Sequence, residues 1–535
     1  VWLAAVAWLL RGIFGGLSFW LALILVAVLP ATYGSYRLLS YGEVFLTARA
    51  WAEGPALLAV ACVIRGHRLA AIASVAFAAA MHPVIAFPAA LFVFFFGFEG
   101  RQQCVLAAVG VLGIFTLNLA GIPPFTDLDK VMDPLWLGLA VERSPFVFLD
   151  QWKLAEYKEV GFLALLLSTA ALVSSPERRR LWWCALAVFS TGMGLALLAV
   201  HWPGVLLIQM QPWRVLWLVR VLAVAAGICL LQATWSSSPY GRILLGAMVA
   251  SAVNVESSGL FCAVLLSGLM VAQNRFAIEP HLPAWYCRIA WCAIILLIGE
   301  DILWRIMLSP VSLDFTQASV IGLSRTERLF IVSKEFGWFV FPPLLLGAWQ
   351  LLRHRPMSGR WLVLISSIFL LYSASHWQRS IRYQVEEEHL QETGFPELTK
   401  IIQPHHLTYW GDAHPYLWFI LHRGSYASFH QAAGLIFSRQ TAIEAYRRLS
   451  RLEKLGLADS RFGWQPDATE GLPEVSPTLD GLIHVCHDPI LDFVVLSQEV
   501  VGTTPVKTFF LSPSAGEFHL YACARLRAFP DPFPS

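Results

Sequence analysis

The chain has 535 residues, of which 57% are hydrophobic and only 14% are charged, and its formal net charge is +2. These values exclude an ordinary soluble globular protein, and so small a net charge gives no reason to expect a nucleic-acid partner. They predict a polytopic membrane protein whose main partner is the lipid bilayer.

Apolar runs separated by short polar links fill the chain as far as residue 376. They predict about 10 to 13 helical spans or half-spans. The runs are 14–33, 54–64, 69–81, 84–98, 104–122, 161–175, 182–200, 213–233, 243–253, 260–273, 284–300, 335–352 and 361–376. Because Val1 already opens an apolar stretch, the sequence is also expected to start part-way through a helix, after a missing N-terminal segment.

Two pairs of short runs are broken by polar residues, at His82-Pro83 and at 254–259, which contains Glu256. Each pair predicts two half-length helices, because a straight span needs about 20 residues. Irregular backbone at membrane depth is tolerated only beside protein or a water-filled cavity, so both breaks are expected to line one. His82 and Glu256 are therefore candidate substrate-binding residues. Alternatively, His82 satisfies backbone groups that Pro83 frees.

The basic links predict which way the chain is oriented. They are residues 65–68, 101, 178–180, 242, 275 and 353–360. If each broken pair goes out and returns, all of them fall on one side, which the positive-inside rule makes cytoplasmic. The outer side then receives 34–53, 82–83, 123–160, 201–214, 254–259, 301–333 and everything after His376. The chain is therefore predicted to be a multi-pass protein of the cytoplasmic membrane.

The segment before the run 54–64 carries Glu43, Arg49 and Glu53. On a helix, Arg49 and Glu53 lie at positions i and i+4 and can form an ion pair. Two interpretations stay open for this segment. It is either an interfacial turn whose charges satisfy one another, or the polar wall of a binding cavity.

The external loop 123–160 contains Asp133, Arg143 and Trp152 among other aromatic residues. A loop of this length is usually functional or disordered, and its aromatic residues argue against disorder. Its carboxylates would be available to a metal ion or a sugar. The alternative is a solvated loop with an amphipathic helix and no catalytic role.

The stretch from Gln209 through Gln211 and Trp213 to Arg214 precedes a long apolar helix. An arginine in the bilayer core costs at least about 2.5 kcal/mol, so Arg214 is expected near an interface or facing a cavity. Pro212 suits the first turn of the helix. The stretch is interpreted either as a clamp for a phosphate or pyrophosphate or as an interfacial anchor.

The tail has a different composition from the rest, which predicts two domains: a membrane domain over 1–376 and a soluble extracytoplasmic α/β domain over 377–535. Strands are predicted at 417–421, 493–496 and 507–511. A helix is predicted to start after Ser438 and end at Gly456.

The tail also contains Cys486 and Cys523, which can pair if it lies outside the cytoplasm. Its histidines match no regular metal-ligand spacing, so no metal site is expected there.

These features resemble the GT-C superfamily of membrane glycosyltransferases. The residues that carry the resemblance are 47–53, Met81-His82-Pro83, the loop from Asp133 to Trp152, 211–214 and the C-terminal α/β domain. The resemblance implies transfer of a sugar from a polyprenyl-phosphate donor to a glycan, lipid or protein acceptor at the outer membrane face. It also implies that Arg214 contacts the phosphate, with or without a divalent cation such as Mg²⁺ or Mn²⁺.

The sequence departs from this family in one respect. The family's catalytic base is an acidic residue in the first external loop, and this sequence is expected to begin after that loop. Asp133 and Glu43 are the external carboxylates left as catalytic candidates. The alternatives are a non-catalytic membrane scaffold with a degenerate fold and, less favoured because no internal repeat is detectable, a transporter.

Overall fold

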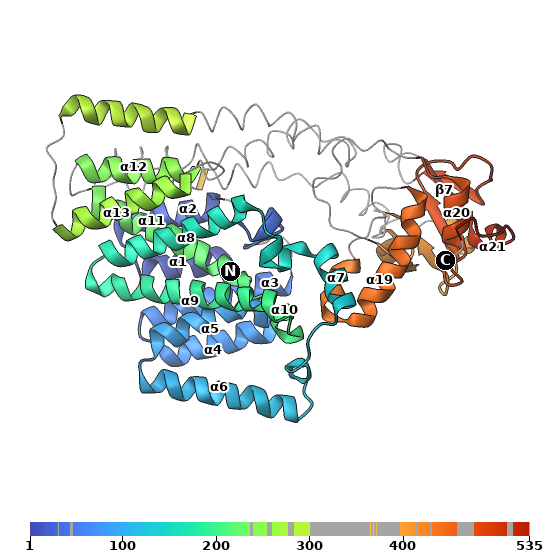
Figure 1. Ribbon diagram of the computed structural model, residues 1–535, viewed down its shortest axis with the longest axis horizontal. Helices are drawn as coiled ribbons and strands as arrows, with labels where there is room; N and C mark the ends of the chain where they lie inside the picture. The colour runs from blue at the N-terminus through green and yellow to red at the C-terminus, as the bar shows by residue number, and fades with distance from the viewer. Residues whose placement is uncertain are drawn as a thin grey trace. The chain divides into compact units, whose positions relative to one another are not determined.

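The computed structural model describes residues 1–29, 31–42, 47–235, 239–253, 259–276, 283–299, 364, 367–368, 371, 396–411, 416–428, 431–456, 476–510 and 517–533. The described residues are mostly helical and form two compact units (Figure 1). Unit 1 contains the described residues up to Val131 and those from Phe146 to Leu371. Unit 2 contains Met132–Pro145 and the described residues from 396 onward. The predicted boundary at 376/377 lies outside the described residues.

Unit 1 is a bundle of helices joined by short links. The helices are α1 (Trp2–Arg11), α2 (Gly16–Val28), α3 (Ala48–Ile64), α4 (Arg68–Met81), α5 (Pro83–Gly97), α6 (Arg101–Leu119), α8 (Leu154–Val173), α9 (Pro176–His201), α10 (Val205–Met210), α11 (Leu216–Trp235), α12 (Pro239–Val253) and α13 (Gly259–Phe276). Another apolar helix covers Ala284–Gly299. The short elements are β1 (Thr32–Tyr33), η1 (Ser35–Arg37), β2 (Leu39–Ser40), η2 (Phe125–Asp127), η4 (Leu149–Gln151) and η5 (Pro212–Val215).

The predicted apolar helices are therefore present throughout the described part of unit 1, and four of them are long and apolar enough to cross a membrane. These four are Arg101–Leu119, Pro176–His201, Val205–Thr234 and Gly259–Phe276. The predicted runs 335–352 and 361–376 fall almost wholly outside the described residues. The number of crossings and their orientation stay predictions.

Helix α11 is the centre of the bundle. In the apolar span Val205–Thr234, which contains α11, 83% of an 18-residue apolar stretch is buried. Trp217 and Leu218 are completely buried. A helix that is hydrophobic on all sides is stable only when other elements cover every side. α2, α8 and α9 supply that cover.

The first predicted break is a tight link between two helices. α4 ends at Met81, and Pro83 occupies the first position of α5, where its missing N–H has no partner to lose. Between them, the His82 Nδ1 atom accepts a long hydrogen bond of 3.4 Å from the Ile85 backbone N–H. His82 thus satisfies a backbone group beside Pro83. The second predicted break, including Glu256, lies outside the described residues.

Basic side chains of separate links meet at one end of the bundle. Arg180 donates to the Phe96 carbonyl at 2.8 Å and forms an ion pair with Glu99, and Arg178 donates to Gln232 at 2.9 Å. The charge pattern predicts that all the basic links gather in this way, and the link 353–360 lies outside the described residues. The side of a membrane to which this end belongs stays a prediction.

Unit 2 is built on a five-stranded mixed sheet with the order β4-β3-β5-β7-β6. β3 runs parallel to β4 and β5, whereas β7 is antiparallel to β5 and β6. The strands are β3 (Leu407–Tyr409), β4 (Gly424–Ser425), β5 (Phe493–Leu496), β6 (Lys507–Phe510) and β7 (Glu517–Ala522). The helical elements are α7 (Pro134–Arg143), α18 (Pro396–Ile401), η6 (Tyr416–Ile420), η7 (Gln431–Phe437), α19 (Arg439–Leu452), η8 (Glu453–Leu455), α20 (Leu479–Cys486) and α21 (Cys523–Leu526).

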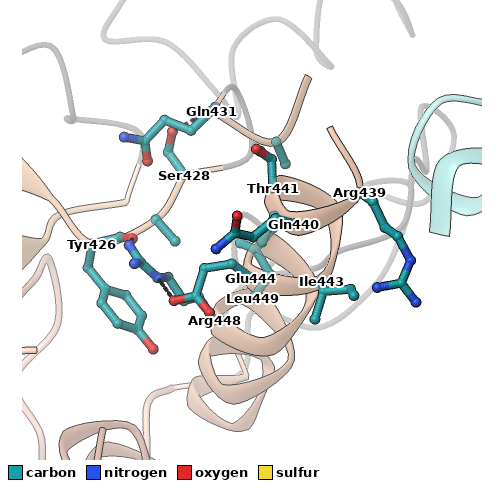
Figure 2. A pocket seen from close by; sticks show the side chains of 13 residues that line it. Tyr426, Ser428, Gln431, Arg439, Gln440, Thr441, Ile443, Glu444, Arg448 and Leu449 are labelled. Atoms are coloured by element: carbon teal, nitrogen blue, oxygen red, sulfur yellow. Dashed lines mark hydrogen bonds and ion pairs between the residues drawn. The ribbon is translucent and has the colours of Figure 1, made fainter. Parts of the chain in front are cut away.

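Two of the three predicted strands and the predicted helix are confirmed. Ser438 Oγ accepts from the Thr441 N–H at 3.3 Å and caps α19, whose first turns border a groove (Figure 2). The helical stretch ends at Gly456, which has a φ of +77°. The strand predicted at 417–421 is wrong, because these residues form the helical turn η6. Its apolar run buries Leu417 and Ile420 three residues apart, a helical spacing that a short run does not distinguish from a strand.

Helix α7, which comes from the loop 123–160, is part of unit 2. The buried Trp136 Nε1 atom donates to the Leu435 carbonyl at 3.0 Å. Asp133 caps α7 by accepting from the Trp136 N–H at 3.3 Å and forms an ion pair with Arg439 at 2.6 Å. The loop is therefore divided, with residues 132–145 in unit 2 and its remainder in unit 1.

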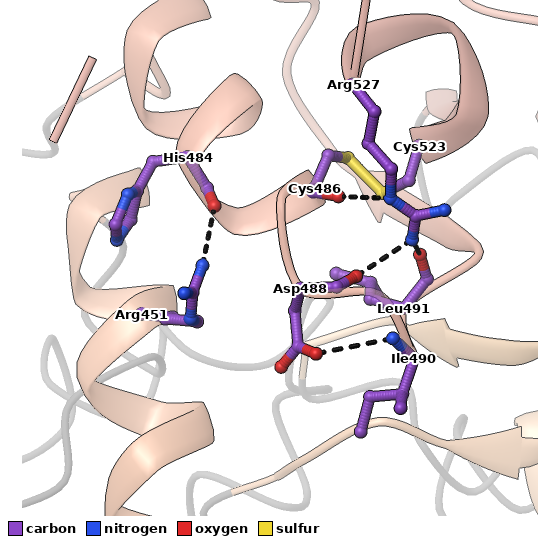
Figure 3. Close-up of a disulfide and its surroundings, with 8 residues drawn as sticks. All are labelled: Arg451, His484, Cys486, Asp488, Ile490, Leu491, Cys523 and Arg527. Carbon is purple, nitrogen blue, oxygen red and sulfur yellow. Dashed lines mark hydrogen bonds between the residues drawn. A yellow bond between two sulfur atoms is a disulfide. The ribbon is translucent and has the colours of Figure 1, made fainter. Parts of the chain in front are cut away.

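A disulfide joins Cys486, at the end of α20, to Cys523, at the start of α21 (Figure 3). Both residues are completely buried. Arg527 holds the same corner, because it donates to the carbonyls of Cys486 and Asp488 at 2.8 Å each. The sequence left open whether these cysteines pair, and the structure joins them; such bonds persist in oxidising compartments.

We expect denatured, unreduced protein to expose seven thiols to a maleimide, and reduced protein to expose nine, because seven of the nine cysteines are free. The double variant Cys486→Ala/Cys523→Ala should lose about 2–5 kcal/mol of unfolding free energy in unit 2. Cys184→Ala, at a buried free cysteine, is the control and should expose one thiol fewer in both states. Nine thiols before reduction would contradict the disulfide.

Candidate functional site

The end of unit 1 opposite its basic links gathers segments that are far apart in the sequence. Trp213, in η5, is only 1% exposed. Its ring lies 5.7 Å from the ring of Trp152 and 6.2 Å from that of Tyr33. Gly34 makes this packing possible, because a Cβ atom there would lie 2.3 Å from the Trp213 ring. Trp213 and Trp152 therefore form the packed floor of this end.

Arg214 lies 5.9 Å from the Trp213 ring centroid, and its charge and that of Arg49 act on His82. Burial lowers the pKa of His82 to about 4, and the positive charges of Arg214 and then Arg49 lower it as well. All three side chains are half-buried. At neutral pH the imidazole is therefore uncharged, and the positive charge belongs to the two arginines.

Gln211 positions Arg214. The Arg214 Nε atom donates to Gln211 Oε1 at 2.8 Å, and its backbone N–H donates to the Gln211 carbonyl at 2.9 Å. Gln211 has the left-handed backbone conformation, with φ +45° and ψ +63°, which is uncommon for a residue with a side chain. A strained residue of this kind persists only where its surroundings require it, and such residues cluster at functional sites.

An ion pair between a buried arginine and a partly exposed glutamate lies beside the aromatic floor. Arg220, on the central helix α11, pairs with Glu159 of α8 and donates to the Thr32 carbonyl at 2.6 Å. Burial raises the pKa of the nearby Tyr41, the charge of Arg220 opposes this, and Glu53 and Glu159 add to it. Tyr41, Arg220, Glu53 and Glu159 are therefore close enough to interact electrostatically.

Two carboxylates hold the links of this end in place. Glu156 accepts from Ser35 Oγ at 2.8 Å and from the Tyr36 N–H at 2.6 Å. Glu53, which is 1% exposed, accepts from the Gly42 N–H at 2.7 Å. The first segment after α2 is thus fixed by carboxylates from α8 and α3.

Many of the candidate residues that the sequence predicted lie in unit 1. Those in unit 1 are Arg49, Glu53, His82, Trp152, Gln209, Gln211, Trp213 and Arg214. Asp133 and Arg143 belong instead to unit 2, where Asp133 caps α7. Arg143 is 2% exposed, and burial lowers its pKa to about 10. Glu43 and Glu256 lie outside the described residues.

Sequence reasoning missed Arg220 and the two glutamates of α8. Arg220 is a charged residue inside an apolar run, which is a functional or structural signal by itself. Glu156 and Glu159 are three residues apart on one helix, so both are placed on one face. These signals were visible, but nothing in the sequence indicated their partners.

The arrangement does not fit a divalent cation. Such ions take oxygen ligands, especially carboxylates, whereas the groups around Arg214 include a second guanidinium and an imidazole. Among the described residues of both units, no group of three His, Cys, Asp or Glu side chains is placed to hold a metal ion. The arrangement fits an anion better.

Comparisons with known proteins give no further guide, since no family model, curated protein or solved structure matches this chain. The interpretation of this end of unit 1 therefore depends on its own geometry.

We expect Glu159→Leu to cost about 3–5 kcal/mol of stability, because it leaves the buried Arg220 charge without its carboxylate. The double variant Arg220→Met/Glu159→Leu should recover much of that loss. Thermal unfolding in lipid nanodiscs measures both. The control Arg180→Met removes an exposed ion pair and should cost less than about 1 kcal/mol. A double variant less stable than Glu159→Leu would contradict this.

The lowered pKa of His82 predicts a pH dependence of stability. Between its ordinary value of 6.5 and about 4, the unfolded chain binds a proton at His82 that the folded chain does not. The folded state should therefore lose stability as the pH falls through this range. In His82→Asn, whose side chain can still cap α5, the loss should be smaller. Unfolding midpoints measured across this range test this, and equal slopes for both proteins would refute it.

Proposed function

We propose that this end of unit 1 binds the phosphate group of a polyprenyl-phosphate-linked sugar, for transfer of the sugar to an acceptor. The observation that carries the proposal is Arg214, which Gln211 fixes in place through a 2.8 Å hydrogen bond and whose charge acts on His82 together with that of Arg49. The adjoining apolar helices suit the isoprenoid chain of such a donor. A membrane anion of this kind combines both chemistries in one molecule.

A planar guanidinium binds phosphate through two parallel hydrogen bonds and keeps its charge at every accessible pH. In the transfer, an acceptor oxygen forms a bond to the sugar C1 atom while the bond from C1 to the phosphate oxygen breaks. Negative charge then develops on the departing phosphate, where Arg49 and Arg214 would stabilise it. Gln211 would act as a positioning residue, because it fixes the Arg214 side chain.

The acceptor hydroxyl must also lose its proton to a base. Bound phosphate would raise the pKa of His82 above its value in the free protein, because an adjacent negative charge favours the imidazolium. Glu43 stays the predicted carboxylate candidate in this region of the sequence. Asp133 receives no catalytic role in this proposal, because its carboxylate caps α7 and pairs with Arg439.

A second candidate is a membrane protein that binds the lipid phosphate without transferring the sugar. The observation that favours it is the structural use of the carboxylates at this end, where Glu53, Glu156 and Glu159 are engaged with backbone groups, Ser35 and Arg220. Both candidates require the same anion site. They differ in whether the sugar leaves the donor.

The proposed location is the outer face of the cytoplasmic membrane, with unit 2 outside the cytoplasm. The charge pattern of the links supports this orientation. The Cys486–Cys523 disulfide supports an oxidising environment for unit 2.

We expect Arg214→Gln and Arg49→Gln each to weaken binding of a polyprenyl phosphate about tenfold or more, because each removes charge-assisted hydrogen bonds. Native mass spectrometry of the protein in nanodiscs measures the affinity for the polyprenyl phosphate. The uncharged polyprenol is the reference ligand; it should bind more weakly, and its affinity should be the same in wild type and variants. Arg214→Lys should retain part of the affinity.

The matched control is Arg180→Gln, an arginine at the opposite end of the same unit. Equal affinity of wild type and both arginine variants for the phosphate would overturn the proposal. If the phosphate binds as expected, a second experiment separates the two candidates. The protein is loaded with a sugar-carrying donor, and mass spectrometry detects whether polyprenyl phosphate is released. Release indicates the transferase, and its absence indicates the non-catalytic candidate.

A further inference from the structure

Unit 2 contains a groove of about 650 Å³ that the proposed function does not use (Figure 2). Tyr426–Ser428 together with Gln431 and Ala432 form one wall, and α19 forms the other. This volume is within the range typical of small-molecule sites. The groove is open because the residues that face one another across it include the small side chains Ala427, Ala432 and Ala445.

The floor of the groove is held rigidly. Arg448 donates to the Tyr426 carbonyl at 2.6 Å, lies 5.3 Å from the Tyr426 ring centroid, and pairs with Glu444 at 2.7 Å. Below it, the Tyr426 hydroxyl donates to the buried Asp488 at 2.6 Å. These contacts fix Arg448 and Glu444 in place before any ligand arrives.

The charges around the groove cancel. Arg439 pairs with Asp133 at 2.6 Å, and Arg447 bridges Glu444 and Asp488 at 2.8 and 2.6 Å. Glu444 also pairs with Arg448, so these three arginines are matched by three carboxylates. Hydrogen bonds from Arg447, then Arg448, outweigh burial and lower the pKa of Glu444 to about 2, so its charge is permanent. A groove without net charge does not select an anion or a cation.

The polar side chains at the rim both donate and accept hydrogen bonds. Gln431, Gln440 and Thr441 are exposed and line the groove. Amide and hydroxyl groups of this kind match the hydroxyls of a sugar, each of which also donates and accepts. The alanines and Leu449 offer apolar surface for the C–H faces of a sugar ring.

We propose that the groove between α19 and the wall of Tyr426–Ser428, Gln431 and Ala432 binds an uncharged segment of an oligosaccharide. Gln431 and Gln440 contact the sugar hydroxyls, and the fixed Glu444–Arg448 pair supplies a charged acceptor and donor at the floor. This proposal depends on unit 2 alone, so its failure would leave the phosphate site of unit 1 unaffected.

The test uses the full chain in lipid nanodiscs, because detergents with sugar head groups would compete for the groove. The probes are uncharged hexasaccharides of glucose and of N-acetylglucosamine, the anionic hexasaccharide of galacturonic acid, and an uncharged Gly-Ser peptide. Saturation-transfer NMR and calorimetric titration should detect at least one of the uncharged hexasaccharides, and neither of the other two probes.

The double variant Gln431→Ala/Gln440→Ala should weaken this binding about tenfold or more, since both positions are exposed and the fold should persist. Gln440→Trp, which fills the groove, should abolish it. Gln403→Ala removes an exposed glutamine elsewhere in unit 2 and should bind as wild type. The proposal is overturned if neither uncharged hexasaccharide binds, if the double variant binds equally, or if the anionic sugar or the peptide binds better.

Discussion

The buried charge of Arg220 constrains the whole end of unit 1 at which the proposed phosphate site lies. A guanidinium on a helix that is otherwise apolar on every side must find partners inside the protein, because isolated buried charges are very costly. Its partners are Glu159 on α8 and the Thr32 carbonyl in the link after α2. One side chain thereby joins the central helix, a neighbouring helix and a surface link. The packing of Tyr33 and Gly34 against Trp213 follows from where this link is held.

The packing around Arg220 also explains why Arg214 is exposed enough to bind a ligand. The aromatic floor of Trp152 and Trp213 covers the core below Arg214, and Gln211 turns the chain sharply in a left-handed conformation. Arg214 therefore leaves the buried region within one residue of Trp213. Arg49 and Arg214 carry the positive charge beside the neutral His82, whereas the charge of Arg220 is matched by Glu159. The Arg220–Glu159 pair holds the fold of this end, and the proposed phosphate site uses the two half-buried arginines.

The sequence predicted the apolar helices well because each is marked by a long run of hydrophobic residues, and long periodic segments are the most reliable signals. It also predicted that 34–53, 82–83 and 201–214 share one end, since alternating crossings leave few arrangements for the basic links. It did not predict that α7 belongs to unit 2, because Trp136 and Leu435 are 299 residues apart and no local pattern records such a contact. For the same reason Asp133 was a catalytic candidate, whereas the structure uses its carboxylate for a cap and an ion pair. Local sequence patterns thus located the polar residues, but only the fold showed which of them already have structural partners within the protein.

The two units differ in how they distribute charge, and this difference separates the ligands that each can select. In unit 1, His82 is neutral because burial, and then the positive charges of Arg214 and Arg49, lower its pKa, so the imidazole adds no positive charge to that of the two arginines. In unit 2, Arg439, Arg447 and Arg448 near the groove each have a carboxylate at hydrogen-bond distance. The groove therefore does not select ligands by their charge, and it must distinguish them by hydrogen-bond pattern and shape. The two proposed ligands, an anionic lipid phosphate at unit 1 and an uncharged glycan at unit 2, follow this difference in charge. The proposed transfer of a phosphate-linked sugar to a glycan would use both kinds of recognition.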